Sequence, residues 1–143
     1  MSYPKILVTL QFGIATILVV FSKGFFSSII YPAIFIIGAA VGFWAIAHNK
    51  RDNFHIVPEM KDGAKLITTG AYRYIRHPMY FSVIVMMLPF VLSTNSFIFW
   101  LLFIVLIVVL YLKAMREERL WQECEEGYCK YKAKTKAIIP FVL

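Results

Sequence analysis

Four long apolar runs constrain this chain more than any other feature of its sequence. They cover about residues 6–22, 25–47, 78–92 and 97–112. A helix needs about 20 residues, with a range of roughly 17–25, to cross the hydrocarbon core of a bilayer. Segments in lipid must satisfy their own backbone hydrogen bonds, and these runs lack the alternating polarity of barrel strands. The sequence therefore predicts an all-α, polytopic membrane protein with about four transmembrane helices.

Composition supports this class. Hydrophobic residues make up 60% of the 143 residues and charged residues 16%, whereas soluble domains have about 45–50% and about 25%. The length predicts a single domain, residues 1–143. With only 7 Gly, 6 Pro and 2 Cys, the sequence excludes a disordered chain, a collagen-like repeat and a disulfide scaffold.

Basic residues are distributed unequally between the two sides that four spans create. Fourteen of the 15 Lys and Arg residues fall on one side, and Lys23 alone falls on the other. Basic residues favour the cytoplasmic side of membrane proteins. We therefore expect both termini, the loop 48–77 and the tail 113–143 to be cytoplasmic. The net charge of +7 then follows from topology, so the expected partner is the lipid bilayer and not a nucleic acid.

The first run differs from a signal peptide at its C-terminal end. Phe21-Ser22-Lys23-Gly24 contains no small-residue cleavage site, and another apolar run begins at once. We expect a retained helix, with Lys23-Gly24 as a short turn before the second span and residues 93–96 as the turn between the last two spans.

Acidic residues are absent from the four predicted spans. All eight lie on the predicted cytoplasmic side, whereas a small proton-coupled exporter needs a carboxylate at membrane depth. Any chemistry is therefore expected at the cytoplasmic face.

The predicted loop ends in Arg76-His77-Pro78, directly before the third span. Because proline favours the first helical position, we expect Pro78 to open the helix with His77 as its cap. Arg76 and His77 would then lie at a helix N-terminus, where free amides and the helix dipole attract anions. This position suits a carboxylate or a phosphate group.

The tail from Lys113 is predicted to form an amphipathic helix, because apolar residues recur in it at helical spacing. Glu117 falls at the start of this stripe, and Glu118 is beside it. Two carboxylates that emerge from a membrane helix are placed to meet a cation held by the loop. The stripe comprises Leu120, Trp121, Cys124, Tyr128 and Tyr131.

Metal-ligating residues are few. Cys124 and Cys129 are five residues apart and do not form a C-x-x-C pair, and the chain has 3 His. This number and spacing of ligands does not fit a zinc site, so no metal is predicted. The cysteines are expected to be packing residues in a reducing compartment.

Two sequence motifs together resemble the integral-membrane methyltransferases, a superfamily that includes isoprenylcysteine carboxyl methyltransferase and the phospholipid N-methyltransferases. The first is the stretch Leu66–Tyr80, which contains Arg76-His77-Pro78-Met79-Tyr80. The second is Glu117-Glu118-Arg119-Leu120, followed by Tyr128, Tyr131 and Pro140. The chain departs from the family pattern at Ser82, where glycine is common, and at Cys124-Glu125, where an aromatic-glycine pair is common.

The resemblance implies that the cofactor is S-adenosylmethionine. Arg76 and the helix N-terminus suit the carboxylate of that cofactor, and Glu117 or Glu118 suits its amino group or ribose hydroxyls. Tyrosine faces suit its sulfonium or adenine, and His77 suits its polar atoms. Catalytic roles are implied for Arg76, Tyr80 and Glu117. The implied cofactor-binding residues are Gly70, Tyr72, Arg76, His77, Pro78, Tyr80, Glu117 and Glu118.

The methyl acceptor is expected to be amphiphilic, because a cytosolic cofactor must meet a substrate held among membrane helices. An isoprenylcysteine-like carboxylate, an apolar thiol and a lipid amine all fit. Two other functions stay open: a non-catalytic four-helix assembly or transport subunit, and an NADPH-binding protein similar to sterol reductases. The chain also leaves open a homo-oligomer.

Overall fold

A computed structural model describes residues 2–53, 66–124 and 127–139. Helices dominate these residues, and no β-strand occurs among them, although a single parallel bridge joins Ile75 to Lys136. The prediction of an all-α chain is confirmed. The helices are α1 (Tyr3–Val20), α2 (Ile30–Asn53), the 3₁₀ helix η1 (Gly70–Arg73), α3 (Pro78–Thr94), α4 (Phe97–Cys124) and α5 (Tyr128–Lys134).

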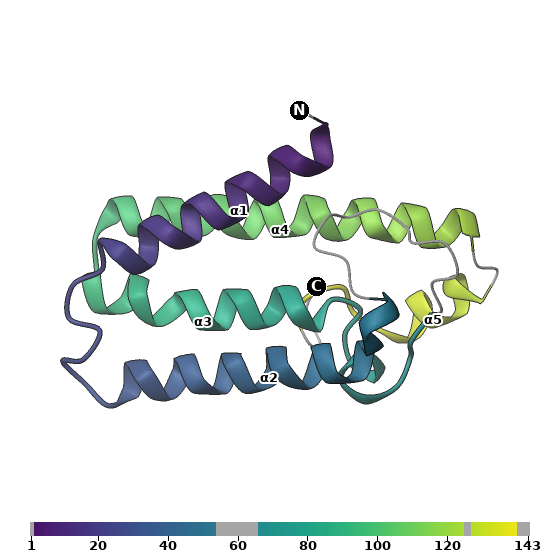
Figure 1. Cartoon of the computed structure of the whole chain (residues 1–143), viewed down its shortest axis with the longest axis horizontal. Helices are drawn as coiled ribbons and strands as arrows, with labels where there is room; N and C mark the ends of the chain where they lie inside the picture. The colour runs from purple at the N-terminus through teal and green to yellow at the C-terminus, as the bar shows by residue number, and fades with distance from the viewer. Residues whose placement is uncertain (1, 54–65, 125–126, 140–143) are drawn as a thin grey trace.

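The four long helices pack side by side, and α3 lies at the centre of the arrangement (Figure 1). Helix α3 contacts α1, α2 and α4, and α1 also packs against α4. Leu18, Val91 and Leu106, one from each of α1, α3 and α4, are fully buried in the shared core. Large apolar side chains such as Phe43 and Phe97 are exposed on the outside, which is the arrangement expected of helices surrounded by lipid.

Three helices are long and apolar enough to cross a membrane: Tyr3–Val20, the Ile30–Asn49 part of α2 and the Phe97–Glu123 part of α4. The third predicted span, α3, is a shorter apolar helix of 17 residues. Length and composition thus support three of the four predicted spans, and the full count of four stays a prediction.

The connection between α1 and α2 differs from the prediction of a two-residue turn. Helix α2 begins at Ile30, not at Phe25. Gly24 adopts a left-handed conformation with φ of 80°, and both the amide (2.9 Å) and the hydroxyl (2.6 Å) of Ser27 donate to its carbonyl oxygen. These local bonds compete with helix formation. Phe25 therefore lies before the start of α2, and its ring stacks on that of Phe90 in α3 with the ring centres 4.5 Å apart.

The prediction that the tail from Lys113 forms one amphipathic helix is also wrong. Helix α4 continues without a break from the apolar run to Cys124, because residues 113–124 contain no Gly or Pro. Tyr128 and Tyr131 lie instead on the separate helix α5, where Tyr128 stacks on Trp121 of α4. The two glutamates are therefore carried on the same rigid helix as the apolar run. Residues 54–65 of the predicted loop and Pro140 lie outside the described residues.

Small residues allow α2 and α3 to approach closely. A Cβ at Gly38 would lie 2.8 Å from Cγ and 2.9 Å from the backbone nitrogen of Met86, and one at Gly42 would lie 2.8 Å from Oγ of Ser82. Two small residues four apart on one helix are typical of close contacts between membrane helices. Ser82, the departure from the family glycine, is itself buried in this contact. We name this close contact of Gly38 and Gly42 with Met86 and Ser82 the α2–α3 seam. It fixes the start of α3 against α2.

We predict that Gly38→Val destabilises the protein by about 1–3 kcal/mol, because the new side chain overpacks the α2–α3 seam. Gly13→Ala in α1 is the matched control, since a Cβ at Gly13 meets nothing within 4 Å, and alanine favours helix. Thermal unfolding of both variants in detergent measures the difference. Equal midpoints for the two variants would show that the seam is loosely packed.

Candidate active site

The start of α3 forms as the sequence predicts. His77 is the N-cap and Pro78 lies at the first turn of the helix. The amides of Arg76 and His77 are not free, however, because they donate to the carbonyls of Lys136 (2.8 Å) and Ala137 (2.9 Å). We name residues 135–138 the C-terminal strap. The strap runs parallel to the residues before α3 and forms one wall of the site.

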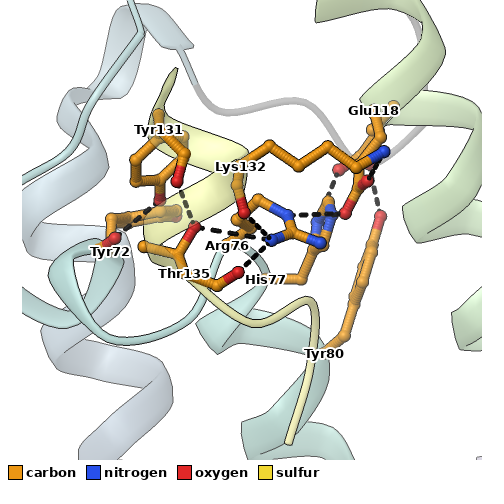
Figure 2. Close-up of polar contacts among 9 residues, drawn as sticks. Tyr72, Arg76, His77, Tyr80, Glu118, Tyr131, Lys132 and Thr135 are labelled. Carbon is orange, nitrogen blue, oxygen red and sulfur yellow. Dashed lines mark hydrogen bonds and ion pairs between the residues drawn. The ribbon is translucent and has the colours of Figure 1, made fainter. Parts of the chain in front are cut away.

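Arg76 connects three parts of the chain. Its Nε lies 2.7 Å from Oε1 of Glu118 on α4. Its Nη1 donates to the carbonyl oxygen of Lys132 at 3.2 Å, to Oγ1 of Thr135 at 3.4 Å and to the carbonyl oxygen of Thr135. Figure 2 shows the guanidinium between Glu118 and the α5 segment. The flat, multiply donating guanidinium suits this arrangement, in which one side chain binds a carboxylate and a folded backbone together.

Glu118 is the most deeply buried acid of the site, with 1% of its surface exposed. Three basic side chains surround it: Arg76, His77 through Nε2 at 3.4 Å, and Lys132 through Nζ at 2.8 Å. A carboxylate withdrawn from water needs such compensation, because desolvation of an unpaired charge costs several kcal/mol. Glu118 therefore serves as the central anion around which α3, α4 and α5 assemble.

His77 lies between the two glutamates. Its Nδ1 is 3.3 Å from Oε2 of Glu117, while Nε2 faces Glu118. Burial alone would lower the pKa of His77, but the two carboxylates that face its ring nitrogens raise the pKa above its usual value. Two acceptors on opposite sides of the ring favour the doubly protonated imidazolium.

Tyr80 and Glu117 form the outer part of the same cluster. The Tyr80 hydroxyl donates to Oε1 of Glu117, and the Tyr80 ring stacks on the His77 imidazole with ring centres 5.4 Å apart. The side chain of Glu117 is 25% exposed, in contrast to that of Glu118. Glu117 is therefore the carboxylate of the pair that a bound molecule can reach.

Tyr72 on η1 carries a buried hydroxyl that has no hydrogen-bond partner among the described residues. The residue is 8% exposed, and its backbone carbonyl accepts a 2.6 Å bond from the Tyr131 hydroxyl of α5. Burial, followed by the charge of Glu117, raises the pKa of Tyr72. Buried hydroxyls are normally paired, so this one has an unused capacity for a hydrogen bond.

The backbone conformation and the surroundings of residue 70 require glycine. Its φ is 62°, and a Cβ there would collide with the imidazole of His48 on α2. Only glycine tolerates both this left-handed backbone and so close an approach of the ring. Gly70 thus lets η1, which carries Tyr72, turn tightly over the end of α2.

The structure brings together the side chains that the sequence singled out from both motifs. Arg76, His77, Tyr80, Glu117 and Glu118 lie in one connected cluster, and Tyr72 is linked to α5 through its backbone carbonyl, which accepts from the Tyr131 hydroxyl. Sequence reasoning missed Lys132, Thr135 and His48, and it named Tyr131 in the second motif without predicting its bond to Tyr72. The individual catalytic and cofactor-binding roles of the singled-out residues stay predictions.

Sequence reasoning counted Lys113 only as a basic residue of the predicted cytoplasmic side and did not predict its burial. The structure buries it, and its Nζ donates to Oε1 of Gln11 on α1 at 2.6 Å. A signal was present, because Gln11 is a polar residue within the first apolar run and a polar group at membrane depth needs a partner.

Comparison with known protein families identifies the family to which the chain belongs. The sequence matches the isoprenylcysteine carboxyl methyltransferase (ICMT) family over residues 29–123, which include both the Arg-His-Pro segment and the glutamate pair. No curated protein and no solved structure matches the chain. Methyltransferases of this family generally use S-adenosylmethionine. The match and the apolar helices identify an integral membrane protein. The chain therefore belongs to the isoprenylcysteine carboxyl methyltransferase family of membrane methyltransferases.

Proposed function

We propose that this protein transfers a methyl group from S-adenosylmethionine to an amphiphilic acceptor at the membrane surface. The observation that carries the proposal is the convergence of two distant segments: Arg76 and His77 before α3 contact Glu118 and Glu117 on α4. In a non-catalytic bundle this buried, charged cluster would have no purpose beyond cohesion. Family membership supplies the reaction class.

The residues present fit the cofactor. Glu117 offers a reachable carboxylate for a cationic or hydroxyl-bearing ligand, and the Tyr72 hydroxyl has an unused hydrogen-bonding capacity. When bound, S-adenosylmethionine supplies a methyl group on a positively charged sulfur. Tyr72 and Glu117 would bond polar groups of this ligand, while Tyr80, whose ring already contacts His77 and Lys113, would act through its hydroxyl on Glu117.

Arg76 is proposed to act through other residues. Its Nε and Nη1 already donate to Glu118, Lys132 and Thr135, so these two atoms are engaged in contacts within the protein. A positioning role fits these contacts better. Arg76 holds the glutamate pair and the C-terminal strap in place around the ligand.

The acceptor is proposed to lie among the apolar helices with its nucleophilic group at the cluster. A carboxylate can attack a methyl carbon without losing a proton, whereas a thiol or an ammonium must first lose one. Of the two carboxylates in the cluster, Glu117 is the partly exposed one. It is therefore the carboxylate proposed to take that proton. Alignment of the nucleophile with the methyl carbon and exclusion of water supply the catalysis, without a metal.

The topology proposed is four spans with both termini in the cytoplasm. The site lies at the end of the bundle where α2 ends and α3 begins. The opposite end carries the turn with Lys23, whose amide donates to Oγ1 of Thr94 at 2.9 Å. The distribution of basic residues favours the cytoplasm for the site end, where S-adenosylmethionine is available.

Ligand-dependent thermal stability of the detergent-purified protein tests the proposal. S-adenosylmethionine and S-adenosylhomocysteine should raise the unfolding midpoint by an amount that grows with the logarithm of ligand concentration. NADPH at the same concentrations should leave it unchanged. Transfer of a labelled methyl group into a lipid and small-molecule extract then identifies the acceptor class.

The outcomes separate the alternatives. Stabilisation by NADPH alone would favour a reductase. No stabilisation by any of the three ligands, with the protein folded by circular dichroism, would favour a non-catalytic membrane subunit.

A further inference from the structure

Helix α1 contributes one polar side chain to the interior of the bundle. Its buried residues recur at helical spacing and comprise Pro4, Leu7, Gln11, Ile14 and Leu18. Gln11 occupies the middle of this stripe, where an apolar residue would be expected. It is 8% exposed, and its Oε1 accepts the 2.6 Å bond from Lys113. The polar residue is therefore matched to a particular partner.

Lys113 is buried more deeply than any other basic residue described, with 2% of its surface exposed. Withdrawal of an ammonium group from water is costly unless it is paired and hydrogen-bonded. The Gln11 carbonyl provides a hydrogen bond, and the Tyr80 ring, 5.0 Å from Nζ to the ring centre, provides an electron-rich face. The ammonium is thus held between α1 and α3.

This ammonium adjoins the candidate active site. The Tyr80 ring beneath it carries the hydroxyl that donates to Glu117, and the His77 imidazole stacks on the same ring. Glu117 follows Lys113 by one helical turn on α4. Displacement of Lys113 would therefore be transmitted to the orientation of Tyr80 and Glu117.

We infer that Gln11 is a positioning residue of the active site, and that α1 is part of the catalytic apparatus although it lies outside the family match. Gln11 holds Lys113 against the Tyr80 ring, which fixes the Tyr80 hydroxyl on Glu117. The effect on turnover rests on the proposed methyltransferase function. The coupling between Gln11 and Lys113 is a property of the ligand-free protein and does not rest on it.

The first test is a double-mutant cycle on the ligand-free protein in detergent. Gln11→Leu removes Oε1, so the Lys113 ammonium loses its hydrogen bond to residue 11. This loss should lower the unfolding midpoint by about 5 °C. The double variant Q11L/K113L should recover most of this loss, since both partners are replaced by apolar groups. Additive effects of the two single substitutions would overturn the inference. Phe12→Leu, on the exposed side of α1, is the matched control and should leave the midpoint unchanged.

The second test separates positioning from simple stability. In Q11L we expect kcat to fall about tenfold or more, with affinity for S-adenosylhomocysteine unchanged within about twofold. Gln11→Glu keeps an acceptor of the same length and should restore kcat. Unchanged kcat in folded Q11L would overturn the positioning role, as would an equal loss of kcat and ligand affinity without rescue by Q11E.

The two proposals fail in different ways. A wild-type protein that binds neither S-adenosylmethionine nor S-adenosylhomocysteine would overturn the proposed function, and the positioning role with it. A wild-type protein that binds both and methylates its acceptor, but shows no coupling between Gln11 and Lys113, would overturn only the present inference.

Discussion

Arg76→Gln is expected to destabilise the protein by about 3–5 kcal/mol, the cost of removing one partner from a buried ion pair. Glu118 would retain His77 and Lys132 but lose the 2.7 Å contact with Nε of Arg76. The carbonyls of Lys132 and Thr135 would lose their shared donor at the same time. The cost combines an undercompensated carboxylate with the loss of side-chain hydrogen bonds to the α5 segment.

Arg76→Lys should fail to restore stability, because a single ammonium cannot reach the glutamate and the strap together. Arg73→Gln is the matched control, since Arg73 lies three residues earlier and is exposed. Thermal unfolding in detergent measures stability, and limited proteolysis followed by mass spectrometry detects release of the C-terminal segment. A midpoint within a degree of that of R73Q would show that Arg76 does not hold the site together.

Glu117→Gln is expected to lower the rate of methyl transfer about a hundredfold or more, within the range known for loss of a positioned acid or base. The amide keeps the shape of the side chain but removes its charge, so the Tyr80 hydroxyl and the His77 imidazole lose their anionic partner. Because Glu117 is partly exposed, we expect the variant to fold.

Glu118→Gln provides the comparison within the pair, since its buried position predicts loss of stability first and of activity as a result. Glu123→Gln, an exposed position on the same helix, should behave as the wild type. Single-turnover assays at saturating S-adenosylmethionine isolate the transfer step. A fully active E117Q variant would remove Glu117 from the proposed mechanism.

The sequence predicted the helices and the composition of the site because both depend on local patterns. Apolar runs must be helical in lipid, and a proline after a capping residue marks a helix start, so Pro78 and His77 were placed correctly. The two motifs flank the α3–α4 hairpin, and a hairpin of adjacent antiparallel helices brings its ends together. This topology explains why Arg76 and Glu118 meet.

The errors concern one local turn and contacts between segments that are distant in the sequence. The start of α2 depends on the Ser27–Gly24 hydrogen bonds and on the stacking of Phe25 on a distant helix. The strap depends on where α5 ends, and the partner of Arg76 in that segment is mostly backbone, which is independent of side-chain identity. The burial of Lys113 was not predicted, because the position of a charge along the sequence does not reveal that its ammonium donates to Gln11 on another helix.

The strap has a consequence for biosynthesis. A ribosome makes the chain from the N-terminus, so α1 to α4 are available for insertion before residues 132–137 have been synthesised. Until those residues emerge, Arg76 lacks its backbone acceptors and Glu118 lacks Lys132. The complete set of contacts around Arg76 and Glu118 can therefore form only after residues 132–137 have been synthesised.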